Sequence, residues 1–282
     1  MLRKFLAGVG VLSLVSVASL APAGAADLAY KAPPPPPVYS WTGLYIGGNG
    51  GGAVSNNATS TAGVDVLGDV LTPGSALIHS EGWIGGIQAG YNWQVAPILV
   101  LGVETDFQLS GLNGSASCVV TCNQLLPPFA VLGVRFNQFD VNQNVDWFGT
   151  VRGRIGFSPG PALLYVTGGL AYGDVDRRTN AQGCFFVVVG GCTVGFGNFS
   201  GSFDHASTQV GWTVGAGAEA KLWGPWSAKV EYLYLDLGRT TDTFTETNFL
   251  FGPIANRTVT TDVRENIIRF GLNYQFNGLA SP

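Results

Sequence analysis

The sequence predicts an all-β protein, an eight-stranded antiparallel up-and-down transmembrane β-barrel with long extracellular loops and short periplasmic turns. Three observations predict this fold. The composition is apolar and poor in charge, apolar and polar residues alternate in eight segments, and long and short connections alternate between those segments. The three must be taken together, because a half-buried strand of a soluble protein also alternates.

The first 25 residues have the features of a secretory signal peptide. Arg3 and Lys4 precede an apolar segment from Phe5 to Leu20, and a small-residue cleavage site follows at Ala23–Ala25. A membrane anchor is the weaker interpretation, because a helix that spans a bilayer needs roughly 20 apolar residues. We therefore expect residues 1–25 to be removed on export.

The composition of the mature chain excludes several classes of protein. Loss of Arg3 and Lys4 leaves 12 basic against 18 acidic residues, a net charge of −6 that gives no reason to expect nucleic acid as a partner. Only 11% of all residues are charged, against roughly 25% in typical soluble domains. Beyond the signal peptide the sequence contains no apolar run long enough for a spanning helix. A closed β-barrel then remains as the way to satisfy backbone polar groups in lipid.

Two short segments flank the predicted barrel, which covers residues 41–276. Residues 26–40 contain five consecutive prolines, Pro33 to Pro37, which favour an extended conformation and cannot donate strand hydrogen bonds. We expect this segment to be a stiff periplasmic spacer, with a docking motif as the alternative. Residues 277–282 would form a periplasmic tail.

Eight segments alternate with the two-residue period of a strand. The last one shows it best, because Ile268, Phe270, Leu272, Tyr274 and Phe276 share one face and the polar residues between them share the other. The predicted strands are Trp41–Gly51, Gly82–Gln94, Ile98–Leu109, Val145–Phe157, Ala162–Asp174, Thr208–Leu222, Trp226–Leu237 and Ile267–Phe276.

The connections between these strands alternate in length. Short turns are predicted at Val95–Pro97, Ser158–Pro161 and Trp223–Pro225, where proline and glycine are concentrated. Long polar loops are predicted at Ser55–Ser80, Ser110–Asn144, Val175–Ser207 and Gly238–Thr261. Short turns on the periplasmic side and long loops on the other are typical of outer-membrane barrels, and both chain ends would then lie in the periplasm.

Charged residues are sorted onto one face of the strands. The predicted outward faces carry no charge at mid-strand, where an Arg or Lys in contact with lipid costs about 2–4 kcal/mol. The predicted inward charges, which we expect to form an ion-pair network in the lumen, are Glu104, Asp106, Arg152, Arg154, Glu219, Lys221, Lys229, Glu231 and Arg269. Eight strands enclose little more than their own side chains, and Leu233 and Leu235 also face inward, so we expect at most a narrow water path.

Aromatic residues are predicted near the strand ends, where girdles of outer-membrane barrels meet the two membrane surfaces. They are Trp83, Trp93, Trp147, Trp212, Trp226, Tyr234 and Phe276. The soluble alternative is a lipocalin-like barrel with an apolar interior. It is disfavoured because nine charges would have to share a small dry lumen with an apolar ligand.

Several motifs resemble a known family. They are Trp41-Thr-Gly-Leu-Tyr-Ile-Gly-Gly, Gly82-Trp-Ile-Gly-Gly-Ile-Gln-Ala-Gly-Tyr-Asn-Trp, Thr167-Gly-Gly-Leu-Ala-Tyr-Gly, Gly211-Trp-Thr-Val-Gly-Ala-Gly-Ala-Glu, Glu231-Tyr-Leu-Tyr and the last strand. Across the mature chain, the sequence resembles the outer-membrane β-barrel family of small porin-like surface proteins of Gram-negative bacteria, related in architecture to the OmpA transmembrane domain.

The resemblance implies a location and partners. The location would be the cell outer membrane, with outer-membrane lipid and lipopolysaccharide as surroundings. Arg269, Gly271, Tyr274 and Phe276 resemble the assembly signal read by the outer-membrane insertion machinery. This sequence departs from the family pattern because six residues follow Phe276, whereas the family commonly ends at the aromatic residue.

Four cysteines lie outside the predicted strands, and an exported protein is in a compartment that permits disulfides. Pairing Cys118 with Cys122 and Cys184 with Cys192 is the simplest of three connectivities. The segment Val187–Val194 also reads as a hairpin that turns at two glycines. That hairpin would hold Cys184 roughly 17 Å from Cys192, so the hairpin and the second bridge exclude each other. Metal binding is disfavoured, because neither pair has the spacing of a zinc site.

The sequence gives little support for catalysis. The two histidines, His79 and His205, fall at outer strand ends, and only Asp204 beside His205 suggests a catalytic pair. We expect no enzyme, no cofactor and no metal, with haem capture by the surface as a minor alternative. The expected role is structural and surface-exposed, contributing to envelope integrity. The main alternative is a passive diffusion channel for small solutes.

Overall fold

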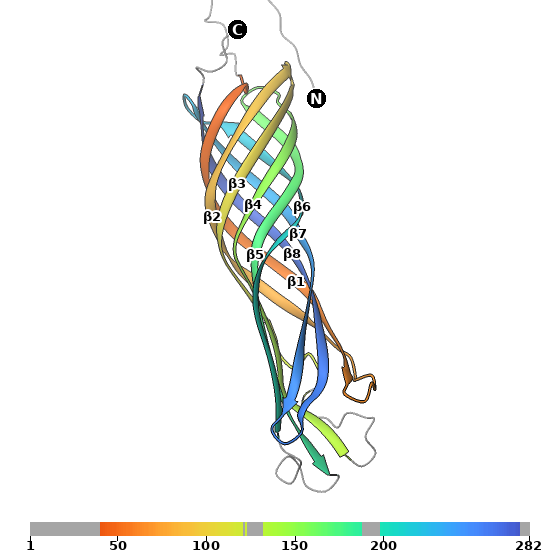
Figure 1. The fold of residues 1–282 in the computed structure, drawn as a ribbon. Helices are drawn as coiled ribbons and strands as arrows, with labels where there is room; N and C mark the ends of the chain where they lie inside the picture. The colour runs from red at the N-terminus through yellow and green to blue at the C-terminus, as the bar shows by residue number, and fades with distance from the viewer. Residues whose placement is uncertain (1–39, 121, 123–131, 188–197, 277–282) are drawn as a thin grey trace, which may run out of the picture. The chain divides into compact units, whose positions relative to one another are not determined.

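The computed structural model describes residues 40–120, 122, 132–187 and 198–276, and these residues form a closed antiparallel barrel. The strands are β1 (Gly43–Asp65), β2 (Gly74–Ala96), β3 (Leu99–Ala116), β4 (Leu132–Phe157), β5 (Ala162–Val187), β6 (Asn198–Lys221), β7 (Trp226–Asn248) and β8 (Gly252–Phe276). Each strand pairs with its neighbours in sequence, and β1 pairs with β8 to close the ring (Figure 1). The predicted eight-stranded up-and-down topology is confirmed. Among the described residues, no helix has the length and apolar character to cross a membrane.

Alternation sorts the side chains between the two faces of the wall. Along β3, Leu101, Val103 and Phe107 are exposed on the outer wall, whereas Glu104 and Asp106 are buried in the interior. Apolar residues outside and charged residues inside are the reverse of a soluble barrel. The exposed apolar residues recur on every strand, and we call their belt around the outer wall the apolar band.

On its outer side the apolar band ends at aromatic side chains that include Trp83, Trp147, Trp212 and Tyr234, and we call them the aromatic girdle. Just beyond this girdle the outward-facing residues become polar. On β2, Glu81 follows Trp83 on this face, and on β7, Asp236 follows Tyr234. Asp174 on β5 and Arg264 on β8 are further charged residues at this level, and Arg264 lies opposite Asp236 in the β7–β8 register. All strands continue past this boundary, and we call their continuation, at the end opposite to Gly43 and Phe276, the outer extension.

The predicted long loops are largely wrong, because most of their residues belong to the outer extension. Ser55–Asp65 continues β1, and the β7–β8 connection is reduced to Phe249–Phe251. Hydroxyl side chains hold these segments together, with Thr59 and Thr261 joined inside the barrel by a 3.0 Å oxygen–oxygen contact. In much of the outer extension, polar residues occupy both faces, so its strands lack the strong apolar alternation on which the prediction depended. The three short turns lie where they were predicted.

Two predictions at strand ends are also wrong. A register shift between Val145 and Trp147 on β4 turns Val145 inward, where it is buried, although regular alternation along the predicted strand would place it on the outward face with Val151 and Ile155. Trp41 precedes β1 and is buried at the barrel mouth, where its indole nitrogen donates a 3.4 Å hydrogen bond to the Gly160 carbonyl. A β-bulge changes which face a residue occupies, and no local sequence pattern marked this one.

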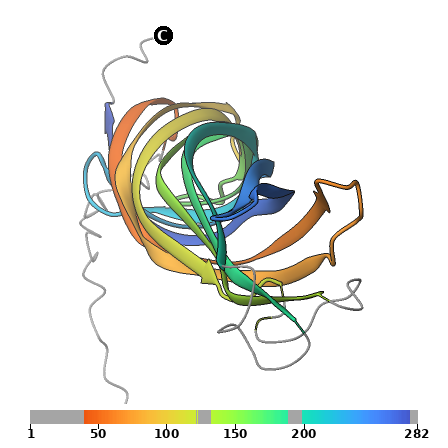
Figure 2. The ribbon, with the colours of Figure 1, turned by 60° about the horizontal axis from the view of Figure 1, so that its bottom comes forward.

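The interior is layered along the barrel axis. A charged layer occupies the part inside the apolar band, and an apolar layer lies next to it on the outer side. The apolar layer draws residues from seven of the eight strands, namely Ala53, Ile84, Leu112, Val145, Phe148, Ala171, Val175, Leu233, Leu235, Leu237, Val263 and Ile267. A second apolar cluster around Phe139, Phe199 and Phe244 lies in the outer extension. Figure 2 shows the outer parts of the β1–β2 hairpin and of β4 and β5 turning away from one another.

Candidate functional site: the lumen network

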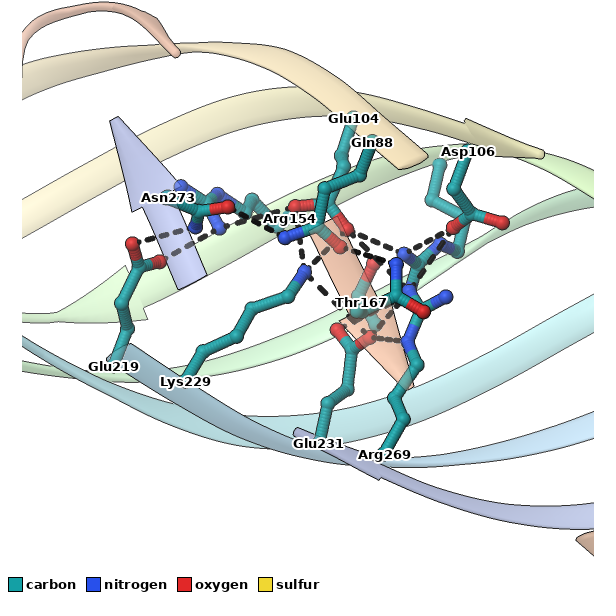
Figure 3. A network of polar contacts seen from close by, with 12 residues as sticks. Gln88, Glu104, Asp106, Arg154, Thr167, Glu219, Lys229, Glu231, Arg269 and Asn273 are labelled. Carbon is teal, nitrogen blue, oxygen red and sulfur yellow. Dashed lines mark hydrogen bonds and ion pairs between the residues drawn. The ribbon is translucent and has the colours of Figure 1, made fainter. Parts of the chain in front are cut away.

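Glu104 on β3 is the centre of the lumen network (Figure 3). Its carboxylate receives Arg152 Nη2 at 2.5 Å and Lys229 Nζ at 2.8 Å, and Arg269 Nη2 lies 3.6 Å away. The hydroxyl of Tyr45 donates a further bond of 2.7 Å to the second carboxylate oxygen. Strands from opposite sides of the barrel therefore meet at one carboxylate.

Asp106 and Glu231 extend the network across the lumen. Arg269 Nη2 lies 3.0 Å from Asp106 Oδ2 and 2.6 Å from Glu231 Oε2, so this guanidinium links β3 to β7. Arg152 does the same, at 2.8 Å from Asp106 and 3.1 Å from Glu231. The Tyr165 hydroxyl donates a 3.0 Å bond to Glu231. Planar guanidinium groups suit such shared contacts because they present several donors in fixed directions.

Glu219 and Arg154 form the end of the network that lies toward the periplasmic turns. Arg154 Nη1 lies 3.2 Å from Glu219 Oε2, and the Arg154 guanidinium lies over the rings of Tyr45 and Tyr165. Asn273 donates a 2.9 Å bond to the other oxygen of Glu219. The aromatic faces and the amide replace water around these charges.

The network is electrically balanced. Four carboxylates, Glu104, Asp106, Glu219 and Glu231, face four cations, Arg152, Arg154, Lys229 and Arg269, and all eight residues are buried. The sequence predicted all eight for the lumen. Pairing offsets the cost of taking charges out of water, whereas a buried charge without a partner costs several kcal/mol.

Lys221, the ninth predicted member, lies outside the network. It is half-buried at the end of β6, where its ammonium lies 4.7 Å from the centre of the Trp41 ring and bonds the side chain of Gln275. Alternation correctly gives the face of Lys221 but not its height in the barrel. Conversely, sequence reasoning missed Tyr45 and Ser227, which both donate to network carboxylates. A signal was present for Tyr45, because apolar Leu44 and Ile46 share one face of the first predicted strand and Tyr45 between them falls on the other face.

The four residues of the predicted assembly signal occupy both faces of β8. Arg269 belongs to the network, and Gly271 faces inward near the Lys229 and Gln88 side chains. Tyr274 and Phe276 lie on the outer wall, with ring centres 5.1 Å apart, and Trp226 packs against Tyr274 at 5.2 Å. Recognition of these residues by insertion machinery stays a prediction.

The three described cysteines lie in the outer extension and its connections. Cys118 and Cys122 form a disulfide with a Cα–Cα distance of 5.2 Å. Cys184, near the end of β5, is buried and also disulfide-bonded. Cys192 and most of the predicted Val187–Val194 hairpin lie outside the described residues.

The two histidines lie on opposite faces of the outer extension, His79 on the outer wall and His205 on the same face of β6 as Phe203, which packs against the second apolar cluster. His79 Nδ1 contacts the side-chain oxygen of Asn56, and the His205 ring packs 5.7 Å from that of Phe203. Asp204, which the sequence suggested as a partner for His205, instead forms an ion pair of 3.2 Å with Arg178. Within the described part of the chain, no group of three or more His, Cys, Asp or Glu side chains could hold a metal ion.

The barrel has an apolar outer wall that ends at an aromatic girdle, and its charged residues are buried in the lumen. These features define the class of outer-membrane β-barrel proteins. Sequence comparison gives the family. The profile of the outer membrane protein beta-barrel domain matches residues 9–276, so the chain belongs to that family and is located in the outer membrane.

Named relatives agree with this assignment. The chain is 36% identical to the 31 kDa outer-membrane immunogenic protein of Brucella melitensis over 93% of this chain and 98% of that protein. It is 32% identical to the 22 kDa outer membrane protein of Rhizobium leguminosarum, over 72% and 67% of the two chains. Among solved structures, OprG from Pseudomonas aeruginosa aligns with 83% of this chain and 97% of its own, at 14% identity and a TM-score of 0.40.

Proposed function

We propose that this protein is a non-conducting structural barrel, which contributes to envelope integrity and presents its outer extension for contact with the cell exterior. It has no enzymatic role in this proposal. Its partners are outer-membrane lipid and lipopolysaccharide around the wall, and the outer-membrane insertion machinery during assembly.

The apolar layer of the lumen is the observation that carries the proposal. Phe148, Leu233, Val263 and Ile267 are each 0% exposed and lie in the lumen next to the charged network, on its outer side, which supports a closed lumen. An ion that passed through would have to leave water at this layer, and a dehydrated charge in an apolar environment costs many kcal/mol. The network below it adds buried, mutually paired charges in place of a water column.

Single-channel recording on the purified full-length protein in planar bilayers tests the proposal. We expect no stable openings for the wild type. Replacement of Phe148 and Leu233 by alanine would thin the apolar layer, and we expect brief openings of small conductance. Stable large-conductance openings of the wild type, or solute-dependent swelling of liposomes that contain it, would instead establish the diffusion channel.

A further inference from the structure

The outer wall carries a polar groove to which the proposed closed lumen gives no role. Its volume is about 750 Å³, and it is lined by residues of β1 to β5 just beyond the aromatic girdle. It crosses the paired strands at one level, where Asn56, His79, Ser115 and Asn142 lie opposite one another in register. We propose that this groove binds the neutral sugar portion of a glycolipid anchored in the outer leaflet.

The lining has the chemistry of a saccharide site. Four asparagines contribute to it, Asn56, Asn113, Asn142 and Asn144, together with Ser115 and His79. Each amide offers both a donor and an acceptor, which matches neighbouring sugar hydroxyl groups. In the part of the chain that the structure describes, the side chains of Asn142, Asn144 and Ser115 make no hydrogen bond to protein, so these groups are available to a ligand.

The charge of the groove selects a neutral ligand over a phosphate. Glu81 and Arg178 line it, one of each sign, and Arg178 is already paired with Asp204 at 3.2 Å and with Asp176 at 3.4 Å. A site for phosphate would present several free cations or backbone donors. We therefore assign the groove to uncharged sugar hydroxyls.

The position of the groove identifies the source of the sugar. Val54 marks its lower edge, at the top of the apolar band, and the outward face of β1 below it carries Gly52, Gly50 and Gly48. Gly48 and Ile46 then line a second, apolar groove of about 890 Å³ on the same strand. A glycolipid can thus place its sugar in the polar groove and an acyl chain along the bare surface of β1.

The outward glycines leave a surface that the barrel itself does not need. A Cβ added at Gly48, Gly50 or Gly52 would meet its nearest backbone oxygen at 3.8, 3.6 and 3.6 Å, which is ordinary contact. At the inward Gly47 and Gly51 the nearest atom would lie at 2.1 Å. Packing within the chain therefore explains the inward glycines, whereas a molecule lying on the outer wall explains the outward ones.

The inference deepens the proposed lipid partnership and rests on it, while conductance measurements test the closed lumen independently. The test is equilibrium binding of the full-length protein, in detergent micelles, to three probes. They are lipopolysaccharide that carries core sugars but no O-chain, lipid A without core sugars, and the free core oligosaccharide. We expect the first probe to bind at least tenfold more tightly than either of the others. Equal binding of lipid A would overturn the sugar assignment, and equal binding of the free oligosaccharide would overturn the membrane source.

Variants locate the binding. The double substitution Asn142→Ala and Asn144→Ala removes two amides that have no protein partner, so we expect folding to be unchanged and binding of the first probe to fall about tenfold or more. The matched control is Thr208→Ala, because Thr208 is an exposed polar residue on β6 beyond the aromatic girdle. We expect this substitution to leave binding unchanged. Wild-type affinity in the double variant, with normal folding on an unboiled gel, would place any binding elsewhere and overturn the proposal.

Discussion

At the scale of residues, the buried ion pairs of the lumen differ sharply from those on the surface. Arg152 contacts Glu104, Asp106 and Glu231, and its side chain is 0% exposed. Arg264 on β8 also contacts two carboxylates, but its side chain is 48% exposed. The two arginines therefore have similar numbers of partners and differ mainly in burial.

Replacing these two arginines by alanine should have unequal effects. We expect Arg152→Ala to lower the free energy of unfolding by about 3–5 kcal/mol, because it leaves the buried network with one negative charge that no cation balances. Arg264→Ala should cost less than about 1 kcal/mol, since solvent screens its pairs. Urea unfolding in lipid vesicles, followed by tryptophan fluorescence, measures both. Equal losses would show that the lumen charges are hydrated.

Glu246 in the outer extension should make local stability depend on pH. Burial raises the pKa of Glu246, and the nearby Arg257, whose Nε lies 2.6 Å away, opposes that rise. A carboxyl group with a raised pKa holds its proton more tightly in the folded state, so its contribution favours folding at low pH. That contribution is lost as the pH rises from the ordinary carboxyl range through the raised pKa.

Hydrogen exchange of the β7–β8 amides in the outer extension measures this dependence after correction for intrinsic exchange rates. We expect protection to decrease as the pH rises through that window in the wild type. Glu246→Gln, which cannot ionise, should flatten the profile. A wild-type profile that is already flat, or one that the substitution leaves unchanged, would assign the pH dependence to another group.

At the scale of elements, the sequence predicted the portion of each strand inside the apolar band but not its full length. In the band, lipid outside and charge inside give a strong alternation, as Val103 and Glu104 show. In the outer extension, water lies outside, and hydroxyl groups lie inside among apolar side chains such as Phe244. Thr241 and Thr243 face outward while Thr240 is buried, so polar residues occupy both faces and the two-residue period is weak.

A charge placed on the outer wall should therefore matter only within the apolar band. Val151 on β4 is 51% exposed at the middle of the band, and we expect Val151→Arg to cost about 2–4 kcal/mol in vesicles. Thr243→Arg, on the outward face of the outer extension, should cost close to nothing because that surface meets water. The free energy of folding in vesicles, measured from the folded and unfolded species on unboiled gels, tests this. A similar loss of folding free energy at both positions would contradict the placement of the apolar band.

At the scale of the whole molecule, the seam between β1 and β8 closes the barrel. Gly51 lies opposite Arg269 in this seam, and a Cβ there would meet the Ile268 carbonyl oxygen at 2.1 Å and Arg269 Cα at 2.7 Å. Its neighbour Gly50 points outward and has room. Packing at the seam thus allows no side chain at Gly51, on the inward face of β1.

Alanine substitutions at these neighbouring glycines should separate the two faces. We expect Gly51→Ala to reduce the yield of closed barrel severely, because backbone atoms of β8 would have to shift. Gly50→Ala should fold at nearly the wild-type yield. The fraction with heat-modifiable mobility after refolding into vesicles measures closure. Equal yields of the two variants would mean that the seam adapts to a side chain.

The distribution of the lumen charges over the strands links electrostatics to completion of the fold. The first seven strands hold four carboxylates but only three cations of the network, and β8 brings the fourth, Arg269. A sheet without its last strand would therefore carry an excess negative charge into the membrane as well as two open edges. The network becomes neutral in the same step that makes the wall continuous. A chain truncated before Arg269 therefore loses both the charge balance and the closure of the barrel.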